Sequence, residues 1–374
     1  EFFEEKGRIH PLQESEIDEI HSLIIESLRN RIYSDVPMGL FLSSGIDSSL
    51  IGCLLKKDLN LDVLSLTVSF DKGLVHDESD KAKKISKYLG LKHIIVDSES
   101  EDSYSSVDNL TSIYGEPNDN STAISVRQMS KIAKNYFTVA FSGTGGDELF
   151  FGYGKHNFLY KNDYFLDNSF LKSLLKKFRS NQFKGFRKIQ TAIFLSQYKG
   201  LDLVFALKNS PYFSDRELAD EFIHSSEILD KEHGSIIKNY INFDLNQNLP
   251  YSIIPAIERS SMREGLEVRT PFLNKGLIEH LSSIDTRRLL HGGQKHILRK
   301  ILSRYLPENL IDRGKRGFVF PIQKLIKENK DSLDEISKKD QTISYINSIA
   351  NEKPEVNKLM LRKLILDNFL EASG

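Results

Sequence analysis

The stretch MGLFLSSGIDSSLIGCLLKK, residues 38–57, contains an apolar run, a turn of small residues and a helical pattern. The run at residues 38–42 is short and follows Pro37, which is typical of a fully buried strand. The residues from 47 to 57 predict a helix. A strand, a tight turn and a helix in this order form the first part of a βαβ unit.

The same alternation extends in both directions from this stretch. Further strands are predicted at residues 63–70, 93–96 and 137–141, and helices at 16–32, 77–89 and 121–134. Alternating strands and helices predict an α/β fold with a parallel sheet flanked by helices. After about residue 153 the pattern is helical, so we expect a helical C-terminal half.

Length and composition limit the classes of protein that fit. A chain of 374 residues suggests two or three domains, and the net charge of -1 favours no nucleic-acid partner. The basic stretch at residues 171–188 is interpreted as a solvated helix face. The single cysteine, Cys53, excludes an intramolecular disulfide and is expected in the core. The sequence shows neither a secretory signal nor a run long enough to span a membrane, so a cytoplasmic location is expected.

The turn at residues 42–49 has the chemistry of a phosphate-binding loop. Its small residues let a backbone approach an anion, and its hydroxyl groups lie beside the amides at the start of a helix. Asp47 repels a phosphate unless a divalent cation bridges the two groups, as Mg²⁺ does. The alternative interpretation is an ordinary helix cap.

A second turn of small residues, FSGTGGDELF at residues 141–150, also follows a predicted strand and precedes a predicted helix. It too places an acid, Asp147, at the helix start. Ligands bind at the carboxyl ends of parallel strands, where both turns are expected. The pair of turns therefore predicts that Asp47 and Asp147 share one Mg²⁺ on a pyrophosphate group.

The first turn resembles the pyrophosphate loop (S-G-G-x-D-S) of ATP pyrophosphatases, and the two turns together resemble the synthetase domain of asparagine synthetases. The other matching segments follow the family's order over about residues 16–325. They are HDES at 76–79, EPNDNS at 116–121, ERSSM at 258–262, LEVRTPFLN at 266–274, KHILR at 295–299 and RGKRGF at 313–318.

This resemblance implies a fold like that of the PP-loop ATP pyrophosphatases and the activity of a carbon–nitrogen ligase. In the family, ATP adenylates a carboxylate, pyrophosphate leaves, and ammonia attacks the acyl-adenylate to form an amide. The implied cofactors are ATP and Mg²⁺, and the simplest acceptor is aspartate, which gives asparagine. The resemblance also divides the chain into a leader or linker remnant at residues 1–12, a nucleotide-binding α/β part at 13–155 and a helical part at 156–374.

The resemblance assigns roles to residues that match the family's motifs. The catalytic residues are Lys295, Glu267 and Thr144, and the acceptor-binding residues are Arg269 and Glu116. The metal-binding acids are Asp47 and Asp147. The residues that bind nucleotide or pyrophosphate are Leu42, Ser43, Ser44, Gly45, Asp47, Ser48, Ser49, Ser69, Ser142 and Gly143. Two alternatives stay open, namely a surface lysine at 295 and a structural ion pair at Arg269.

Two positions depart from the family's pattern. Ser44 replaces a glycine of the loop, and Thr144 stands where the family usually has an acid. A threonine hydroxyl is no general base, although Glu267 or Glu148 offers a substitute. The alternatives to asparagine formation are therefore amidation of another carboxylate, such as a sugar acid, a peptide or an amino-acid derivative, and a non-catalytic nucleotide-binding relative.

The resemblance covers no glutaminase domain, because Glu1 begins the chain only a few residues before the synthetase-like part. Ammonia is therefore expected from solution, from a glutaminase subunit or from an upstream segment. A homodimer is one expected assembly.

Overall fold

The computed structural model describes residues 10–69, 79–97, 107–167, 236–311 and five positions between 362 and 370. The basic stretch at 171–188 and the segment at 313–318 lie outside the described residues, as do residues 76–78 and most of the predicted leader.

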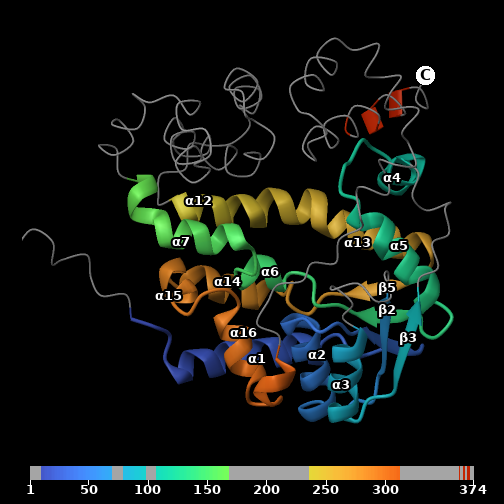
Figure 1. The fold of residues 1–374 in the computed structure, drawn as a ribbon, viewed down its shortest axis with the longest axis horizontal. Helices are drawn as coiled ribbons and strands as arrows, with labels where there is room; N and C mark the ends of the chain where they lie inside the picture. The colour runs from blue at the N-terminus through green and yellow to red at the C-terminus, as the bar shows by residue number, and fades with distance from the viewer. Residues whose placement is uncertain are drawn as a thin grey trace, which may run out of the picture. The chain divides into compact units, whose positions relative to one another are not determined.

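Five parallel strands form one sheet in the order β3-β2-β1-β4-β5 (Figure 1). The strands are β1 Met38–Phe41, β2 Leu64–Ser69, β3 His93–Asp97, β4 Val139–Phe141 and β5 Glu267–Arg269. The predicted parallel sheet flanked by helices is thereby confirmed.

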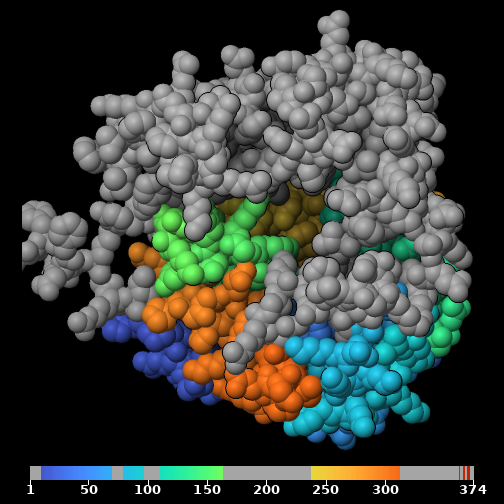
Figure 2. All heavy atoms as spheres, viewed as in Figure 1, coloured from blue at the N-terminus to red at the C-terminus, as the bar shows by residue number. Residues whose placement is uncertain are grey.

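The helices of the unit that contains the sheet come from both sequence halves. They are α1 Glu14–Arg29, α2 Ile46–Lys57, α3 Ser79–Leu89, α4 Val107–Tyr114, α5 Thr122–Ala133, α6 Gly146–Leu149, α13 Ile254–Arg263, α14 Lys275–Ser283, α15 Thr286–Leu290 and α16 His296–Leu302, followed by a 3₁₀ turn at Glu308–Leu310. Figure 2 shows α3 (cyan) beside the segment that ends at the 3₁₀ turn (orange) on one face. This agrees with the contact between α3 and the 3₁₀ turn.

Alternation along β1 places its neighbouring side chains on opposite faces of the sheet. Leu40 is fully buried and meets α2 at Gly52, whereas Phe41 joins the apolar cluster on the other face. That cluster includes Phe137, whose ring lies where a side chain at Gly39 would stand. Glycine at position 39 therefore lets an aromatic ring pack directly on the strand. β1 lies in the middle of the sheet, so the turn that follows it is held by buried structure on both sides.

The fifth strand is not among the elements that the sequence predicts. β5 has only three residues, too few to show a period of two, and Glu267 is exposed. It forms because β4 offers a free edge, with Val139 opposite Glu267 and Phe141 opposite Arg269.

The chain contacts divide the protein into two compact units, residues 1–152 with 249–374 and residues 153–248. The predicted helical part, 156–374, thus supplies β5 and α16 to the unit that holds the sheet. The predicted domain division itself stays a prediction. Among the described residues, no helix is both long and apolar enough to cross a membrane.

The second unit contains α7 Gly154–Asp167, α12 Ile236–Phe243 and the first part of the π-helix Asp244–Ile253. The helices α7 and α12 pack against each other. His156 is fully buried, and its Nε2 lies 3.0 Å from Oδ2 of Asp244. This polar pair joins α7 to the π-helix inside the unit.

Candidate active site

The loop from β1 to α2 is folded around its own serine hydroxyls. The Ser43 amide donates to Oγ of Ser48 at 3.1 Å, and the Gly45 amide donates to Oγ of Ser43 at 3.0 Å. The two hydroxyl oxygens lie 2.9 Å apart. Leu42, just after β1, still donates to the Leu66 carbonyl at 2.9 Å, so the loop starts from the sheet itself. Donor groups thus gather at the N-terminus of α2, the position that suits an anion.

The remaining predicted loop residues lie close to this turn and are buried. Ser44 and Ser49 are 2% and 1% exposed. Ser69 ends the neighbouring strand β2, is 6% exposed, and its hydroxyl finds no hydrogen-bond partner among the described residues. A buried hydroxyl of this kind, at the carboxyl end of a strand, suits a ligand.

The second turn leads from β4 into α6 and is joined to β5. The Ser142 amide donates to the Arg269 carbonyl at 2.9 Å, and its hydroxyl lies 2.9 Å from that of Thr144. Gly145 has a φ of 91°, a conformation that favours glycine. Thr144 is therefore held by a hydroxyl pair within its own turn.

Two glycines of the second turn lie directly against Asp47 of the first loop. A Cβ added at Gly143 would stand 2.7 Å from Cβ of Asp47, and one at Gly146 would stand 2.6 Å from its Cγ. Any larger residue at these positions pushes the two turns apart. The predicted convergence of the turns is thus achieved by contact between glycine backbone and Asp47.

Lys295 connects the acids of both turns. Its Nζ lies 2.5 Å from Oδ2 of Asp47 and 2.6 Å from Oδ1 of Asp147. The lysine side chain is 12% exposed, and the two aspartates are 16% and 26% exposed. A lysine from the predicted helical part therefore completes a largely buried cluster of one positive and two negative groups.

The backbone around Lys295 is tied to the segment that follows α6. Lys295 precedes α16 with a φ of 50°, and its amide donates to the Phe150 carbonyl at 3.0 Å. The Gln294 side-chain amide donates to the Gly152 carbonyl at 3.0 Å. A Cβ at Gly152 would lie 1.7 Å from Oδ1 of Asp147 and 2.4 Å from Cε of Lys295. Glycine at position 152 therefore leaves room for the ion pair.

The protonation of Lys295 follows from its surroundings. Burial opposes the charged ammonium, but the charges of Asp47 and Asp147 outweigh it and raise the pKa of Lys295 above its ordinary value of 10.5. The amine thus stays protonated at neutral pH.

The acids at this cluster fit a divalent cation that also binds phosphate. Both acids offer carboxylate oxygens to a single cation. In this structure the ammonium of Lys295 lies between the two carboxylates. Within the described part of the chain, no group of three or more metal-binding side chains occurs. Mg²⁺ typically takes one or two protein carboxylates and completes its shell with phosphates and water. Two acids therefore suffice for this ion.

Arg269 and Glu267 lie on β5 and form their own pair. Nε of Arg269 donates to Oε1 of Glu267 at 2.6 Å, and its NH1 group donates to the carbonyls of Arg31 and Tyr33. These contacts tie the segment after α1 to the edge of the sheet and support the structural interpretation of Arg269. The acceptor-binding role predicted for Arg269 and the catalytic role predicted for Glu267 stay predictions.

Glu116 follows α4 and is 54% exposed at its side chain. It pairs at 3.3 Å with Arg259 of α13, which also donates to the Tyr114 carbonyl. The structure thus groups Glu116 with α13, while Asp47, Asp147 and Lys295 form the ion cluster. The role of Glu116 toward an acceptor stays a prediction.

Three residues of the cluster's support were missed by the sequence reasoning, namely Gly146, Gly152 and Gln294. Gly146 and Gly152 flank the segment that contains Asp147, so a search for further glycines around that acid would have found them. Nothing in the local sequence marks Gln294, because its partner lies 142 positions away.

Cys53 plays no part in this cluster. It is fully buried in α2, and burial raises the pKa of its thiol to about 12. A thiol of this kind is unreactive. The prediction that it is a core residue is confirmed.

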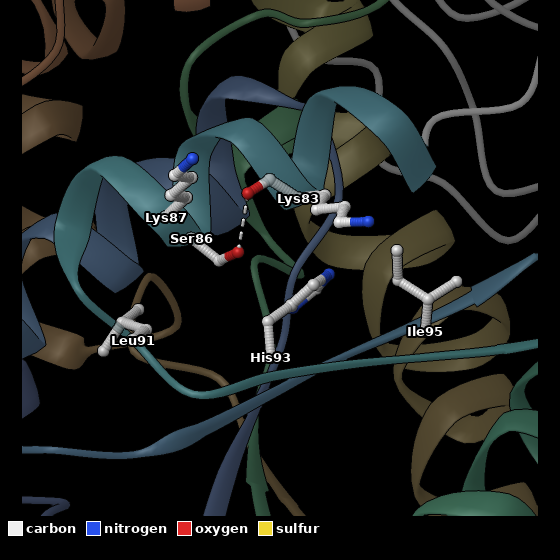
Figure 3. A pocket seen from close by; sticks show the side chains of 6 residues that line it. All are labelled: Lys83, Ser86, Lys87, Leu91, His93 and Ile95. Carbon is white, nitrogen blue, oxygen red and sulfur yellow. Dashed lines mark hydrogen bonds between the residues drawn. The ribbon is translucent and has the colours of Figure 1, made fainter.

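An open pocket with a volume of about 460 Å³ lies between α3 and β3 (Figure 3). Figure 3 shows Lys83 and Lys87 on the helix above His93 and Ile95 of the strand. Its lining contains none of the residues predicted for the site.

The fold and the ion cluster define an α/β protein in which two turns of small residues meet at one edge of a parallel sheet. The family model for asparagine synthase matches residues 19–371, so this chain belongs to the asparagine synthase family.

Curated relatives agree with this assignment. The chain is 28% identical over 365 residues to glutamine-hydrolyzing asparagine synthetase 1 of Bacillus subtilis (strain 168), covering 91% of this chain and 56% of that protein. It is 22% identical over 370 residues to asparagine synthetase 3 of the same organism, covering 95% and 55%. A putative asparagine synthetase of Methanocaldococcus jannaschii is 31% identical over 149 residues, 40% of this chain and 28% of that protein. The chain thus spans about half the length of the two Bacillus relatives.

Proposed function

We propose that this chain is the synthetase part of an ATP-dependent, amide-forming ligase that adenylates aspartate and transfers ammonia to it. The products are asparagine, AMP and pyrophosphate. The observation that carries the proposal is the convergence of Asp47, Asp147 and Lys295 between the two turns. Membership of the asparagine synthase family supports the reaction class.

The residues of the cluster suit the handling of a polyphosphate. A carboxylate is a poor electrophile. Adenylation makes it a good electrophile, because AMP then serves as the leaving group. Negative charge develops on phosphoryl oxygens in that step, so preorganised positive groups stabilise it. Lys295 supplies a permanent ammonium, and the α2 N-terminus with Ser43 and Ser48 supplies donors. Asp47 and Asp147 would hold Mg²⁺, which would supply positive charge against the leaving pyrophosphate.

Aspartate is the proposed acceptor because the curated relatives carry the name asparagine synthetase. The same names, glutamine-hydrolyzing, support ammonia supply by a glutaminase domain or subunit. We propose a cytoplasmic location for the reaction, in line with the expectation from the sequence.

The test is pyrophosphate release from ATP and Mg²⁺ in the presence of ammonium, with and without aspartate. We expect release that depends on aspartate, with asparagine formed in equal amount. A panel of sugar acids, peptides and amino-acid derivatives serves as the comparison. Release with another carboxylate alone moves the assignment to that acceptor, and ATP binding without release under all conditions identifies a non-catalytic relative.

Thr144 gives a second test of the acceptor. Its hydroxyl is paired with that of Ser142, and it carries no charge to assist the amine. We expect Thr144→Asp to raise the rate of amide formation without changing aspartate-dependent adenylation. An unchanged rate of amide formation means that another group, such as Glu267 or Glu148, serves the amine.

A further inference from the structure

The ammonium of Lys295 contacts both of the aspartates that the proposed function assigns to a divalent cation. Nζ contacts Oδ2 of Asp47 at 2.5 Å and Oδ1 of Asp147 at 2.6 Å. Both contacts are close ion pairs between the ammonium and a carboxylate. A divalent cation that binds the same two carboxylates must therefore compete with this lysine.

The lysine is held in place by the fold. Its amide is bonded to the Phe150 carbonyl, and the neighbouring Gln294 amide is bonded to the Gly152 carbonyl. The missing side chain at Gly152 leaves space for Cε of Lys295. With 12% of the side chain exposed, the ammonium has little contact with water that could replace its two aspartates.

An ATP polyphosphate changes this competition. Its oxygens are alternative acceptors for the ammonium, and the donors at the α2 N-terminus lie beside Asp47 to receive it. Once the ammonium has a phosphate partner, both carboxylates become available to a cation. Without an anion, a second cation at the cluster meets like-charge repulsion from Lys295.

We infer that Lys295 is an internal counter-ion that blocks divalent-cation binding at Asp47 and Asp147 until a nucleotide polyphosphate accepts its ammonium. This inference rests on the proposed function, because it takes the two aspartates as metal ligands. In this scheme a divalent cation binds only together with a nucleotide. Without nucleotide, the positive charge of Lys295 prevents free divalent cations from binding.

The experiment measures Mn²⁺ binding to the nucleotide-free protein by electron paramagnetic resonance. We compare wild type with Lys295→Met, which removes the charge, and with Lys300→Met as the matched control. Lys300 lies on α16, the helix that Lys295 precedes, and pairs with Glu14 at the surface. We expect Lys295→Met to bind Mn²⁺ at least ten-fold more tightly than wild type and Lys300→Met to match wild type. Equal affinity of Lys295→Met and wild type overturns the inference.

Two further substitutions separate charge from shape. Lys295→Gln is neutral and is expected to show the same tightening, so it replaces the Met variant if that protein does not fold. Lys295→Arg keeps the charge and is expected to bind Mn²⁺ as weakly as wild type. Tight binding by Lys295→Arg contradicts the role of the charge.

The carboxylates are tested in the same background. Adding Asp147→Asn to Lys295→Met is expected to return Mn²⁺ affinity to the wild-type level. Mn²⁺ binding that stays tighter than in wild type overturns the inference. Aspartate-dependent pyrophosphate release by wild type is measured separately. If release occurs and is lost in Asp47→Asn, but Lys295→Met shows no tightening, the inference alone fails. If no carboxylate supports pyrophosphate release although Lys295→Met binds Mn²⁺ more tightly than wild type, the proposed function fails.

Discussion

The ammonium of Lys295 lies 2.5 Å from Oδ2 of Asp47, although 248 positions separate the two residues in the chain. This contact joins the first turn of α2, which follows the central strand β1, to the residue that precedes α16. Asp147 shares the same ammonium, so a change at any of the three residues alters the charge that the other two experience.

Replacing Asp47 by asparagine is expected to lower pyrophosphate release by about 100-fold or more, the size found when a preorganised charged contact is lost. The reason is that a neutral amide at this position leaves Lys295 with one carboxylate and the cation site with one charged ligand. Asp62→Asn is the control, because Asp62 is a surface residue paired with Lys56. A rate within a factor of two of wild type for Asp47→Asn contradicts the proposed site.

Gly143→Ala is expected to destabilise the protein by about 1–3 kcal/mol and to impair activity, since the new methyl group clashes with Asp47 and with the Ser48 amide. Gly154→Ala is the matched control, because its added methyl group meets nothing within 4 Å. Urea unfolding measures the free energy, and pyrophosphate release measures the activity. Equal stability of the two variants would show that the turns do not approach each other as described.

Arg269→Ala is expected to cost about 1–3 kcal/mol of stability, because its guanidinium holds the carbonyls of Arg31 and Tyr33. Arg287→Ala, which breaks a surface pair with Asp285, serves as the control and is expected to change little. Thermal unfolding gives the stabilities. A higher KM for aspartate with unchanged stability would instead assign Arg269 to acceptor binding.

The raised pKa of Lys295 predicts a pH dependence of stability with a definite sign. Its ion pairs favour the protonated amine in the folded state, so their contribution is fully present below the ordinary pKa of 10.5. That contribution is lost as the pH rises through the higher pKa of the folded protein. Urea unfolding from about pH 9 to pH 11.5 is therefore expected to show a difference between wild type and Lys295→Met that shrinks only above pH 10.5. A difference that already shrinks between about pH 9 and pH 10.5 would contradict the raised pKa.

Much of the fold could be predicted because its information is local. The apolar runs that form β1, β2, β3 and β4 and the helical patterns that form α1, α2, α3 and α5 lie within a few residues of the observed bounds. β5 could not be predicted in this way, since three residues with an exposed glutamate form a strand only beside β4.

The same difference between local and distant information applies to the candidate site. That Asp47 and Asp147 lie at one sheet edge followed from two turns that each come after a buried strand, and those strands proved to be neighbours. The place of Lys295 rested on the family resemblance alone, because a lysine before a helix looks like any surface lysine. Its partners depend on the segment at 150–152 and on Gln294.

By itself, the sequence determined the strands, the two small-residue turns and the acids at the start of the helices that follow them, since neighbouring residues decide these features. Only the tertiary structure decided that glycine backbone rests on Asp47 and that one lysine serves both acids. The physical reason is distance along the chain. Such contacts exist only after the C-terminal segment has returned to the sheet, and no local pattern records where it returns.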